Sequence, residues 1–372
     1  MKKSLVILTV SWALALLFAS WTPLLGGGPL KKTDFSIHND LWYYFDNREF
    51  AASGDYPLPS MTTHALVYAP TFEFSFAPSK GVRHALRVGA EFAHDFGSLT
   101  WSDALREGLI WYQGSARARS GLFEAYAGVF PRTVMESNWS EAFFSDQHKF
   151  LDRNMEGLLL RWKSDSFLGE LACDWMGMKG YDRKERFQIL SAGSWKPTLG
   201  ARCTDFFSAG WNVSYYHYSG SVVAPGVVDN GLGSLWAKLD AAPGASKWKE
   251  ISLKAAILQG YHRDRTQSKK ALLPTGGEIE AALAFMSLRL SNTLYYGGDQ
   301  TPFYYGTDTA GNPYGEMLYF CQPLYSGLYD RVELNWEPRI GSNLHLRIGA
   351  RAHFCAEGFL GWQQVVSLKA DF

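Results

Sequence analysis

Alternation of apolar and charged residues with period two is the sequence feature that most constrains the fold of this chain. The segment 83–96 shows it most clearly. Successive side chains of an extended strand point to opposite faces, so such a segment has one apolar face and one charged face. The apolar face carries Leu86, Val88, Ala90, Phe92 and Phe96, and the charged face carries Arg83, Arg87, Glu91 and Asp95. A slip of one residue would exchange the two faces, so the pattern also fixes the strand register.

Sixteen segments read as strands between residue 33 and the last residue. They lie at about 34–46, 71–76, 83–96, 105–116, 123–129, 158–163, 167–175, 184–196, 205–218, 235–240, 250–257, 278–285, 288–297, 331–337, 344–354 and 364–372. The fourth of these segments alternates poorly. Connections after the second, fourth, sixth, tenth, twelfth and fourteenth segments are short, and those after the first, fifth, ninth, eleventh and thirteenth are long. This arrangement is typical of a barrel with tight turns and both chain ends on one side.

Two kinds of sheet protein could have strands with this pattern, a soluble β-sandwich and a membrane β-barrel. A soluble β-sandwich would bury one apolar face per strand against a second sheet, but it has no reason to alternate short and long connections. In hydrocarbon, every backbone N–H and C=O must be paired within the protein, so a sheet there must close on itself. Arg or Lys turned toward lipid near the midplane would cost about 2–4 kcal/mol. We therefore predict an all-β fold, a transmembrane antiparallel up-and-down β-barrel of about 16 strands, within a range of about 14–18.

The N-terminus predicts export. Lys2 and Lys3 precede an apolar run from Leu5 to Ala19, and a Pro/Gly-rich patch follows at 23–29. This order is typical of a secretory signal peptide, with an uncleaved anchor helix as the alternative. Beyond residue 30 there is no apolar run of about 18 residues that could form a helical span. We predict a signal peptide over 1–28 with an open cleavage site, one barrel domain over 33–372, and a place in the cell outer membrane.

Composition excludes several function classes. The 36 Lys and Arg residues are balanced by 36 Asp and Glu residues, which argues against a nucleic-acid surface. The 14 Trp and 19 Tyr residues suit the aromatic girdles of a membrane barrel. The cysteines have no metal-type spacing and their pairing stays open; they are Cys173, Cys203, Cys321 and Cys355. Without a nucleophile elbow, phosphate loop, dinucleotide fingerprint or zinc motif, the sequence predicts no enzyme, no cofactor and no metal site.

Charges of both signs fall on the faces that a barrel turns inward. The predicted pore-lining residues are Arg83, Arg87, Glu91, Asp95, Glu124, Arg161, Glu170, Asp174, Arg331, Glu333, Glu337, Arg347 and Arg351. Sixteen strands enclose a lumen too wide for side chains alone to fill. The pattern therefore favours an aqueous, weakly selective channel for passive diffusion of small polar solutes. The alternative is that these charges pair across strands and rigidify the interior, which is the favoured interpretation for Arg347 and Arg351 opposite Glu333 and Glu337.

Two long connections are candidates for function. The long loop 132–153 follows the fifth segment and is the third outside loop in our count, and its position resembles the third loop of general porins, which folds into the barrel and sets the constriction. The constriction candidates in it are Glu136, Glu141, Asp146 and Lys149, together with His148. A solvated surface loop is the alternative. The segment 298–327 is rich in Tyr and could present aromatic faces to sugars, so the second function hypothesis is a non-conducting barrel whose surface loops bind a partner or polysaccharide.

The end of the chain and five short motifs resemble known membrane proteins. The last segment ends on Phe372, as in bacterial outer-membrane barrels whose terminal strand carries the signal read by the barrel-assembly machinery. The motifs are Asp46-Asn47-Arg48-Glu49-Phe50, His94-Asp95-Phe96-Gly97, Phe130-Pro131-Arg132, Asp174-Trp175 and Val227-Val228-Asp229-Asn230. Together they resemble an uncharacterised family of porin-like bacterial outer-membrane proteins. This resemblance implies a barrel in contact with outer-membrane lipid and a passage for small polar solutes or oligosaccharides, and leaves open whether three copies assemble.

Overall fold

The structure of the chain is a computed structural model. It describes residues 33–50, 60–97, 104–199, 202–203, 206–241, 247–266, 270–304, 306–307, 311 and 324–372. The predicted signal peptide 1–28 and Cys321 lie outside the described residues. Cys173 and Cys355 both carry free thiols. No helix in these described ranges is long and apolar enough to cross a membrane.

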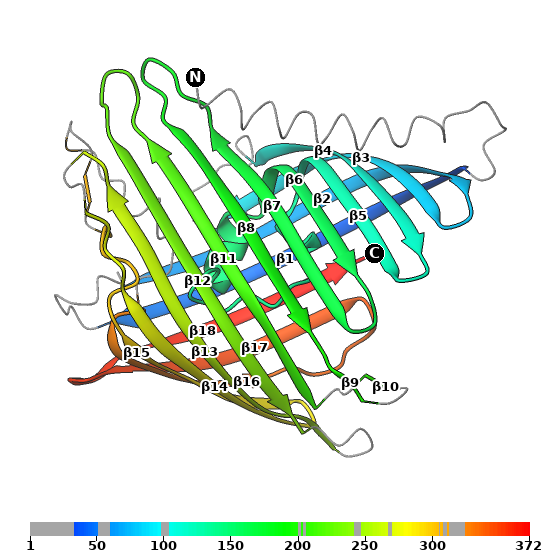
Figure 1. The fold of residues 1–372 in the computed structure, drawn as a ribbon. Helices are drawn as coiled ribbons and strands as arrows, with labels where there is room; N and C mark the ends of the chain where they lie inside the picture. Colours follow the sequence, from blue (N-terminus) through cyan, green and yellow to red (C-terminus); the bar gives the residue numbers. More distant parts are fainter. Residues whose placement is uncertain are drawn as a thin grey trace.

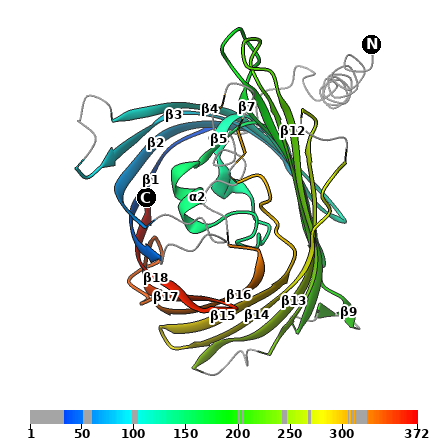
Figure 2. The same ribbon diagram turned by 90° about the vertical axis from the view of Figure 1, so that its left-hand side faces the viewer.

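Sixteen antiparallel strands close into one barrel, as the sequence predicted (Figures 1 and 2). Each strand pairs with its neighbours along the chain, and the first pairs with the last. The barrel strands are β1 (Thr33–Phe50), β2 (Met61–Ser79), β3 (Val82–Asp95), β4 (Leu105–Ala118), β5 (Gly121–Pro131), β6 (Asn154–Lys163), β7 (Phe167–Gly177), β8 (Glu185–Trp195), β11 (Phe207–Ser219), β12 (Val227–Asp240), β13 (Trp248–Asp264), β14 (Thr275–Phe285), β15 (Leu288–Gly297), β16 (Gly327–Trp336), β17 (Leu344–Cys355) and β18 (Gly358–Asp371). A separate two-stranded sheet, β9 (Thr198–Leu199) with β10 (Arg202–Cys203), is formed by the connection that joins β8 to β11 in the sequence.

The seam between β1 and β18 closes the barrel. Its register runs from Asp40 opposite Asp371 to Phe50 opposite Gly361. At its end, the backbones of Asn39 and Phe372 exchange two hydrogen bonds, with N–O distances of 2.7 and 3.0 Å. Because every strand then has two neighbours, the barrel has no unpaired sheet edge.

Connections at the two ends of the barrel differ in length. At the end that holds Phe372, only two residues join β2 to β3, β4 to β5 and β14 to β15. Gly81, in the first of these turns, has a φ of 86°, which a residue with a side chain rarely adopts. The other end carries long connections, including 132–153 and 298–326. The connection between β17 and β18 is an exception, because it lies at the long-loop end and has only two residues.

The two faces of the strands follow the predicted alternation. Leu86 points outward and is 46% exposed, whereas its neighbour Arg87 points inward to Glu73, with 2.5 Å between Nε and Oε2. Leu235 and Ile257 are likewise outward-facing and largely exposed. The outer wall is therefore apolar over most strands, and most charged side chains lie inside.

Candidate functional site

The loop 132–153 folds into the barrel. It contains a 3-10 turn, η3 (Arg132–Val134), and a short helix, α2 (Asp146–Leu151). Ser145 caps α2 by accepting a hydrogen bond from His148 N at 3.1 Å, which satisfies one of the free N–H groups at the helix start. Figure 2 shows α2 inside the ring of strands. The loop is therefore an interior element, and its charges meet the barrel wall.

Buried arginines hold the two ends of the loop. Arg132 donates from Nη2 to Asp174 on β7 at 2.9 Å and to Asp152 at 2.7 Å. Arg153 lies 3.1 Å from Glu91 on β3 and 2.5 Å from Asp40 on β1. Hydrogen bonds to charged groups in buried sites are stronger than neutral ones, so these contacts fix where the loop enters and leaves the wall.

The first part of the loop lies against β6 and β7. The backbone N–H groups of Glu136 and Ser137 each donate to the carboxylate of Glu170 at 2.9 Å. Glu170 also accepts from Arg161 Nε at 2.8 Å. The Glu136 side chain pairs with Arg161 at 3.3 Å and with Lys163. This part of the loop therefore covers the charged inner face of β6 and β7.

The middle of the loop crosses to the opposite wall. Ser140 donates to Glu278 on β14 at 3.0 Å, and Glu141 pairs with Arg331 on β16. Asp146 then reaches β17, where its Oδ2 accepts from both Arg347 and Arg351 at 2.6 Å. These partners lie between 138 and 205 residues from the loop in sequence.

Ion pairs lower the pKa of two aspartates in the loop, Asp146 and Asp152. Burial alone would raise the pKa of Asp146, but Arg347 and Arg351 outweigh it and hold that pKa well below its usual range. Burial also acts on Asp152, where Arg132 and His148 reverse the effect and lower the pKa to about 2. Both carboxylates are therefore charged at neutral pH, Asp146 in its contact with the arginines of β17 and Asp152 in its contact with Arg132.

An apolar cluster in the lumen supports the loop, and the sequence did not predict it. Trp139, Phe143 and Phe144 of the loop are buried in it. Inward-facing members from both sides of the barrel are Leu109, Trp111, Tyr126, Leu159, Ala172, Leu190, Ala192, Trp236 and Leu258. A second cluster packs Phe150 of α2 against Trp42 and Tyr44. The aromatic residues of the loop were the available signal, because a loop in water has no reason to carry so many.

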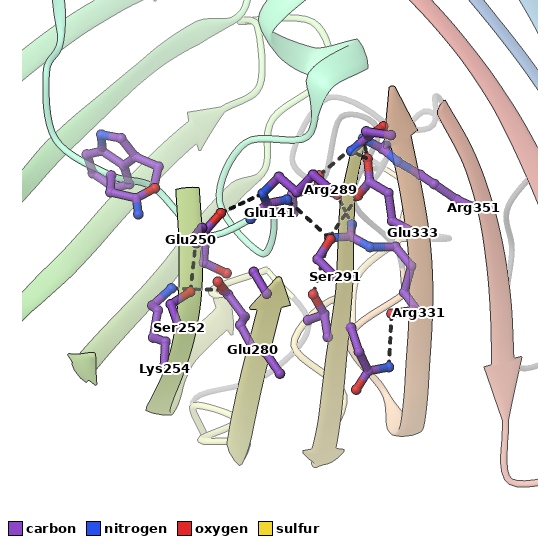
Figure 3. A pocket seen from close by; sticks show the side chains of 18 of the residues that line it. Glu141, Glu250, Ser252, Lys254, Glu280, Arg289, Ser291, Arg331, Glu333 and Arg351 are labelled. Carbon is purple, nitrogen blue, oxygen red and sulfur yellow. Dashed lines mark hydrogen bonds and ion pairs between the residues drawn. The ribbon is translucent and has the colours of Figure 1, made fainter. Parts of the chain in front are cut away.

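A charged cavity of about 390 Å³ lies between the loop and β12 to β17. Figure 3 shows charged side chains of these strands facing the cavity, with Glu141 of the loop among them. Seven basic and five acidic side chains line it. They are Lys149, Lys238, Lys254, Arg289, Arg331, Arg347 and Arg351, with Glu141, Glu250, Glu280, Glu333 and Glu337. The space is thus polar, charged and off the barrel axis, on the side away from β6 and β7.

The structure divides the thirteen sequence-predicted pore residues into three groups. Five line the cavity: Arg331, Glu333, Glu337, Arg347 and Arg351. Five more are buried on the inward side but do not line the cavity, and the loop or its flanking residues contact most of them: Glu91, Glu124, Arg161, Glu170 and Asp174. Arg83 and Arg87 pair with Glu73 on the neighbouring strand, and Asp95 is the last residue of β3.

The four constriction candidates of the loop are also separated. Glu141 and Lys149 line the cavity. Glu136 pairs with β6, away from the cavity, and Asp146 sits beside the cavity lining as the ligand of two arginines. Glu333 does pair with Arg351 across strands at 3.0 Å, whereas Arg347 pairs with the loop. Cross-strand pairing therefore accounts for part of this ladder only.

A scan against models of known protein families and a search of curated proteins both found no match for this chain. Solved structures do match. OmpF of Salmonella typhi is 10% identical, with 91% of this chain and 97% of that chain covered and a TM-score of 0.51. OprB of Pseudomonas putida is 10% identical, with 95% and 96% covered and a TM-score of 0.50. A loop-deletion mutant of OmpT, an outer membrane protein of Vibrio cholerae, is 9% identical, with 91% and 99% covered and a TM-score of 0.50.

At these identities the likeness concerns the fold alone. The match extends over nearly the whole of each chain, so it includes the closed barrel and not only a group of strands. The resemblance to porin-like outer-membrane barrels is therefore confirmed at the level of architecture: this chain has the fold of a sixteen-stranded outer-membrane β-barrel.

Proposed function

We propose that this protein is an outer-membrane channel that lets small polar solutes diffuse passively through a narrow, off-axis passage. The observation that carries the proposal is the charged cavity of about 390 Å³ inside a closed barrel, bounded by the interior loop on one side and β12 to β17 on the other. Mixed charge on such a wall favours hydrated polar solutes over apolar ones. A loop that fills part of the lumen limits the passage to small solutes.

The location in the outer membrane is part of the same proposal. Large apolar side chains such as Leu235, 69% exposed, and Ile257, 65% exposed, point away from the barrel. In water, so large an apolar surface would be unfavourable, whereas lipid covers it without cost. Removal of residues 1–28 during export and recognition of the strand that ends at Phe372 by the assembly machinery complete this proposal.

Planar-bilayer recording of the purified protein tests the channel. We expect stepwise openings in potassium chloride and swelling of proteoliposomes in small sugars but not in larger oligosaccharides. A variant that lacks residues 136–148 should conduct more, because the loop fills part of the lumen. Folded protein that inserts into bilayers without any openings would overturn the proposal.

A second candidate function is a barrel without conduction whose surface loops bind a partner or polysaccharide. One observation favours it. The tips of the connections after β7 and β11 are joined by hydrogen bonds from Val222 N to Gly180 O and from Val223 N to Tyr181 O, both at 3.2 Å. Tyr181 and Val222 are 75% and 61% exposed, and exposed apolar groups at a loop tip are typical of contact surfaces. Loss of cell-surface ligand binding after Tyr181→Ser, in a protein that does not conduct, would support this function instead.

A further inference from the structure

A buried carboxylate lies on the outer face of the barrel, at the end that carries the long connections. Asp229 is the third residue of β12 and is 1% exposed. It shares a face of that strand with Leu235, because side chains of alternate residues point the same way, and Leu235 is one of the exposed apolar residues of the outer wall. The side chain of Asp229 therefore points away from the lumen and is covered by its neighbours.

Three polar side chains from the neighbouring strands contact this carboxylate. Its Oδ1 atom accepts a hydrogen bond from Tyr215 OH at 2.8 Å and lies 2.9 Å from His217 Nδ1, both on β11. Its Oδ2 atom accepts from Arg265 Nε at 2.5 Å, and Arg265 is the first residue after β13. Both carboxylate oxygens therefore have partners, and Asp229 fixes the position of these three side chains.

Arg263 brings a second guanidinium group to the same place. It lies directly opposite Asp229 in the register of β12 and β13. Among the residues that the structure describes, the ion pair of Asp229 with an arginine is made by Arg265, and none includes Arg263. The Nε atom of Arg263 is buried and has no hydrogen-bond partner in these residues. A buried donor without an acceptor is unfavourable, so an oxygen atom of a ligand would be stabilised there.

The other charged residues near this place leave an excess of positive charge. Arg186 and Asp264 fall at inward-facing positions, opposite Tyr218 and Val228. Counting the two arginines and Asp229, the outer side of β8 to β13 and the connection between β7 and β8 hold five bases and three acids within the described ranges. They are Lys179, Arg183, Lys184, Arg263 and Arg265, with Asp182, Glu185 and Asp229. A ligand that fits this charge is an anion.

Aromatic side chains place the two arginines at the boundary of the membrane. Trp175 on β7, Phe187 on β8 and His217 on β11 stack in a row across the outer wall, with ring centroids 5.4 and 4.9 Å apart. Tyr261, two residues before Arg263 on β13, is 40% exposed on the same wall. Figure 1 shows these strands side by side. Such aromatic residues gather where hydrocarbon meets lipid headgroups, which is the depth of the lipid phosphates.

We infer that Arg263 and Arg265 bind the phosphate group of an anionic membrane lipid on the outer wall of the barrel. The inference rests on the lipid-facing wall that we propose above and does not depend on conduction. Guanidinium groups bind phosphate oxygens through paired, charge-assisted hydrogen bonds. Arg263 supplies donors that no protein group uses, and Arg265, whose side chain is 48% exposed, is oriented by Asp229. The apolar wall nearer the middle of the barrel then contacts the acyl chains of the same lipid.

Native mass spectrometry of the purified full-length protein with dioleoylphosphatidic acid tests this site. We expect wild-type protein to retain the lipid and Arg263→Gln to weaken its apparent affinity by about fivefold, as expected for one basic residue at a membrane surface. Arg119→Gln is the matched control, because it removes the same charge from the exposed turn between β4 and β5 at the other end of the barrel. Its affinity should equal that of wild type. Arg263→Lys keeps the charge without the planar fork and should lose less affinity than Arg263→Gln.

Two further measurements show whether the ligand is an anionic lipid. Dioleoylphosphatidylcholine has the same chains and a phosphate but carries a compensating cation, so it should bind more weakly than dioleoylphosphatidic acid. Excess inorganic phosphate lacks acyl chains and should not displace the bound lipid. Equal affinities of folded wild type and Arg263→Gln, equal affinities for the two lipids, or displacement by inorganic phosphate would each overturn the site. Absence of channel openings in a protein that still binds the lipid would overturn the channel function alone. Heat-modifiable migration on gels checks that each variant is folded.

Discussion

Arg351 Nη2 and Asp146 Oδ2 lie 2.6 Å apart, although 205 residues separate the two in the sequence. Arg351 also lies 3.0 Å from Glu333 Oε1 on the neighbouring strand, and its side chain is 4% exposed. One buried guanidinium group therefore joins the interior loop to two strands of the far wall. Because a charge buried without its partners is costly, this contact helps to fix where the loop crosses the lumen.

Replacement of Arg351 should loosen the loop. Arg351→Met removes the shorter of the two ion pairs of Glu333 and leaves Asp146 with one arginine partner instead of two. Breaking a buried pair typically costs about 3–5 kcal/mol. We expect a lower unfolding free energy in guanidinium titrations of protein in lipid vesicles, and larger, noisier conductance steps. Arg347→Met is the matched control, since Arg347 is 25% exposed and forms an ion pair with Asp146 alone among the residues that the structure describes. Equal losses for the two variants would contradict the bridging role of Arg351.

Phe150 should anchor α2 through packing. It is 1% exposed, its ring stacks on Tyr44 with centroids 4.8 Å apart, and its edge meets Trp42 at 5.2 Å. Truncating a buried Phe typically costs about 3–5 kcal/mol. Phe150→Ala should therefore expose the loop, and limited trypsin digestion should cut after Lys149 faster than in wild type.

Phe359→Ala provides the control for that experiment. Phe359 is 59% exposed on the outer wall, where its loss changes nothing in the lumen. The rate of trypsin cleavage after Lys149 in Phe359→Ala should match that of wild type. Unaltered cleavage in Phe150→Ala would show that ion pairs alone hold the loop.

Acid should weaken the loop through Asp152. Its pKa is lowered from 3.8 to about 2 in the folded protein, so the folded state binds fewer protons than the unfolded state between these values. The stabilisation is therefore fully present above about pH 4 and is lost as the pH falls through about 2. Allowing for solvent around a carboxylate that is one-third exposed, we expect about 1–2 kcal/mol.

Unfolding free energies at several values between pH 5 and pH 2 measure this effect. Asp152→Asn cannot titrate, so its free energy should fall less over this range than that of wild type. Parallel curves for the two proteins would show that Asp152 does not contribute.

The strands could be predicted from the sequence because each one faces two different solvents. In the segment 83–96 the large apolar residues and the charged residues fall on opposite faces, and a shift of one residue would turn Arg87 toward the apolar side. The segment at β4 alternates poorly for a physical reason. Leu109 and Trp111 face the lumen, where they join the apolar cluster around the loop, so both faces of that strand carry apolar residues.

The contacts of the loop could not be predicted in the same way. Its charged residues suggested an interior position, but Glu141 and Asp146 find their partners on β16 and β17, 190 and 201 residues away. No local sequence pattern specifies such pairs, because the sequence does not show which of the inward-facing arginines is the partner of a given loop carboxylate. Which of the predicted pore residues line the cavity and which lie outside it depends on where the loop lies, and so this division required the structure.

The outward direction of Leu334 offers a direct test of the lipid-facing wall. Leu334 lies on β16 between the outward-facing Val332 and Trp336 and is 51% exposed. An arginine at a lipid-facing position near the midplane costs about 2–4 kcal/mol, so Leu334→Arg should lower the unfolding free energy in vesicles by that amount. Ser291→Arg, on the cavity side of the adjacent strand, places the same charge in the lumen and should change stability by less than about 1 kcal/mol. Because the two substitutions differ chiefly in the face that carries the charge, an equal effect of both would contradict a barrel with an apolar outer wall in lipid.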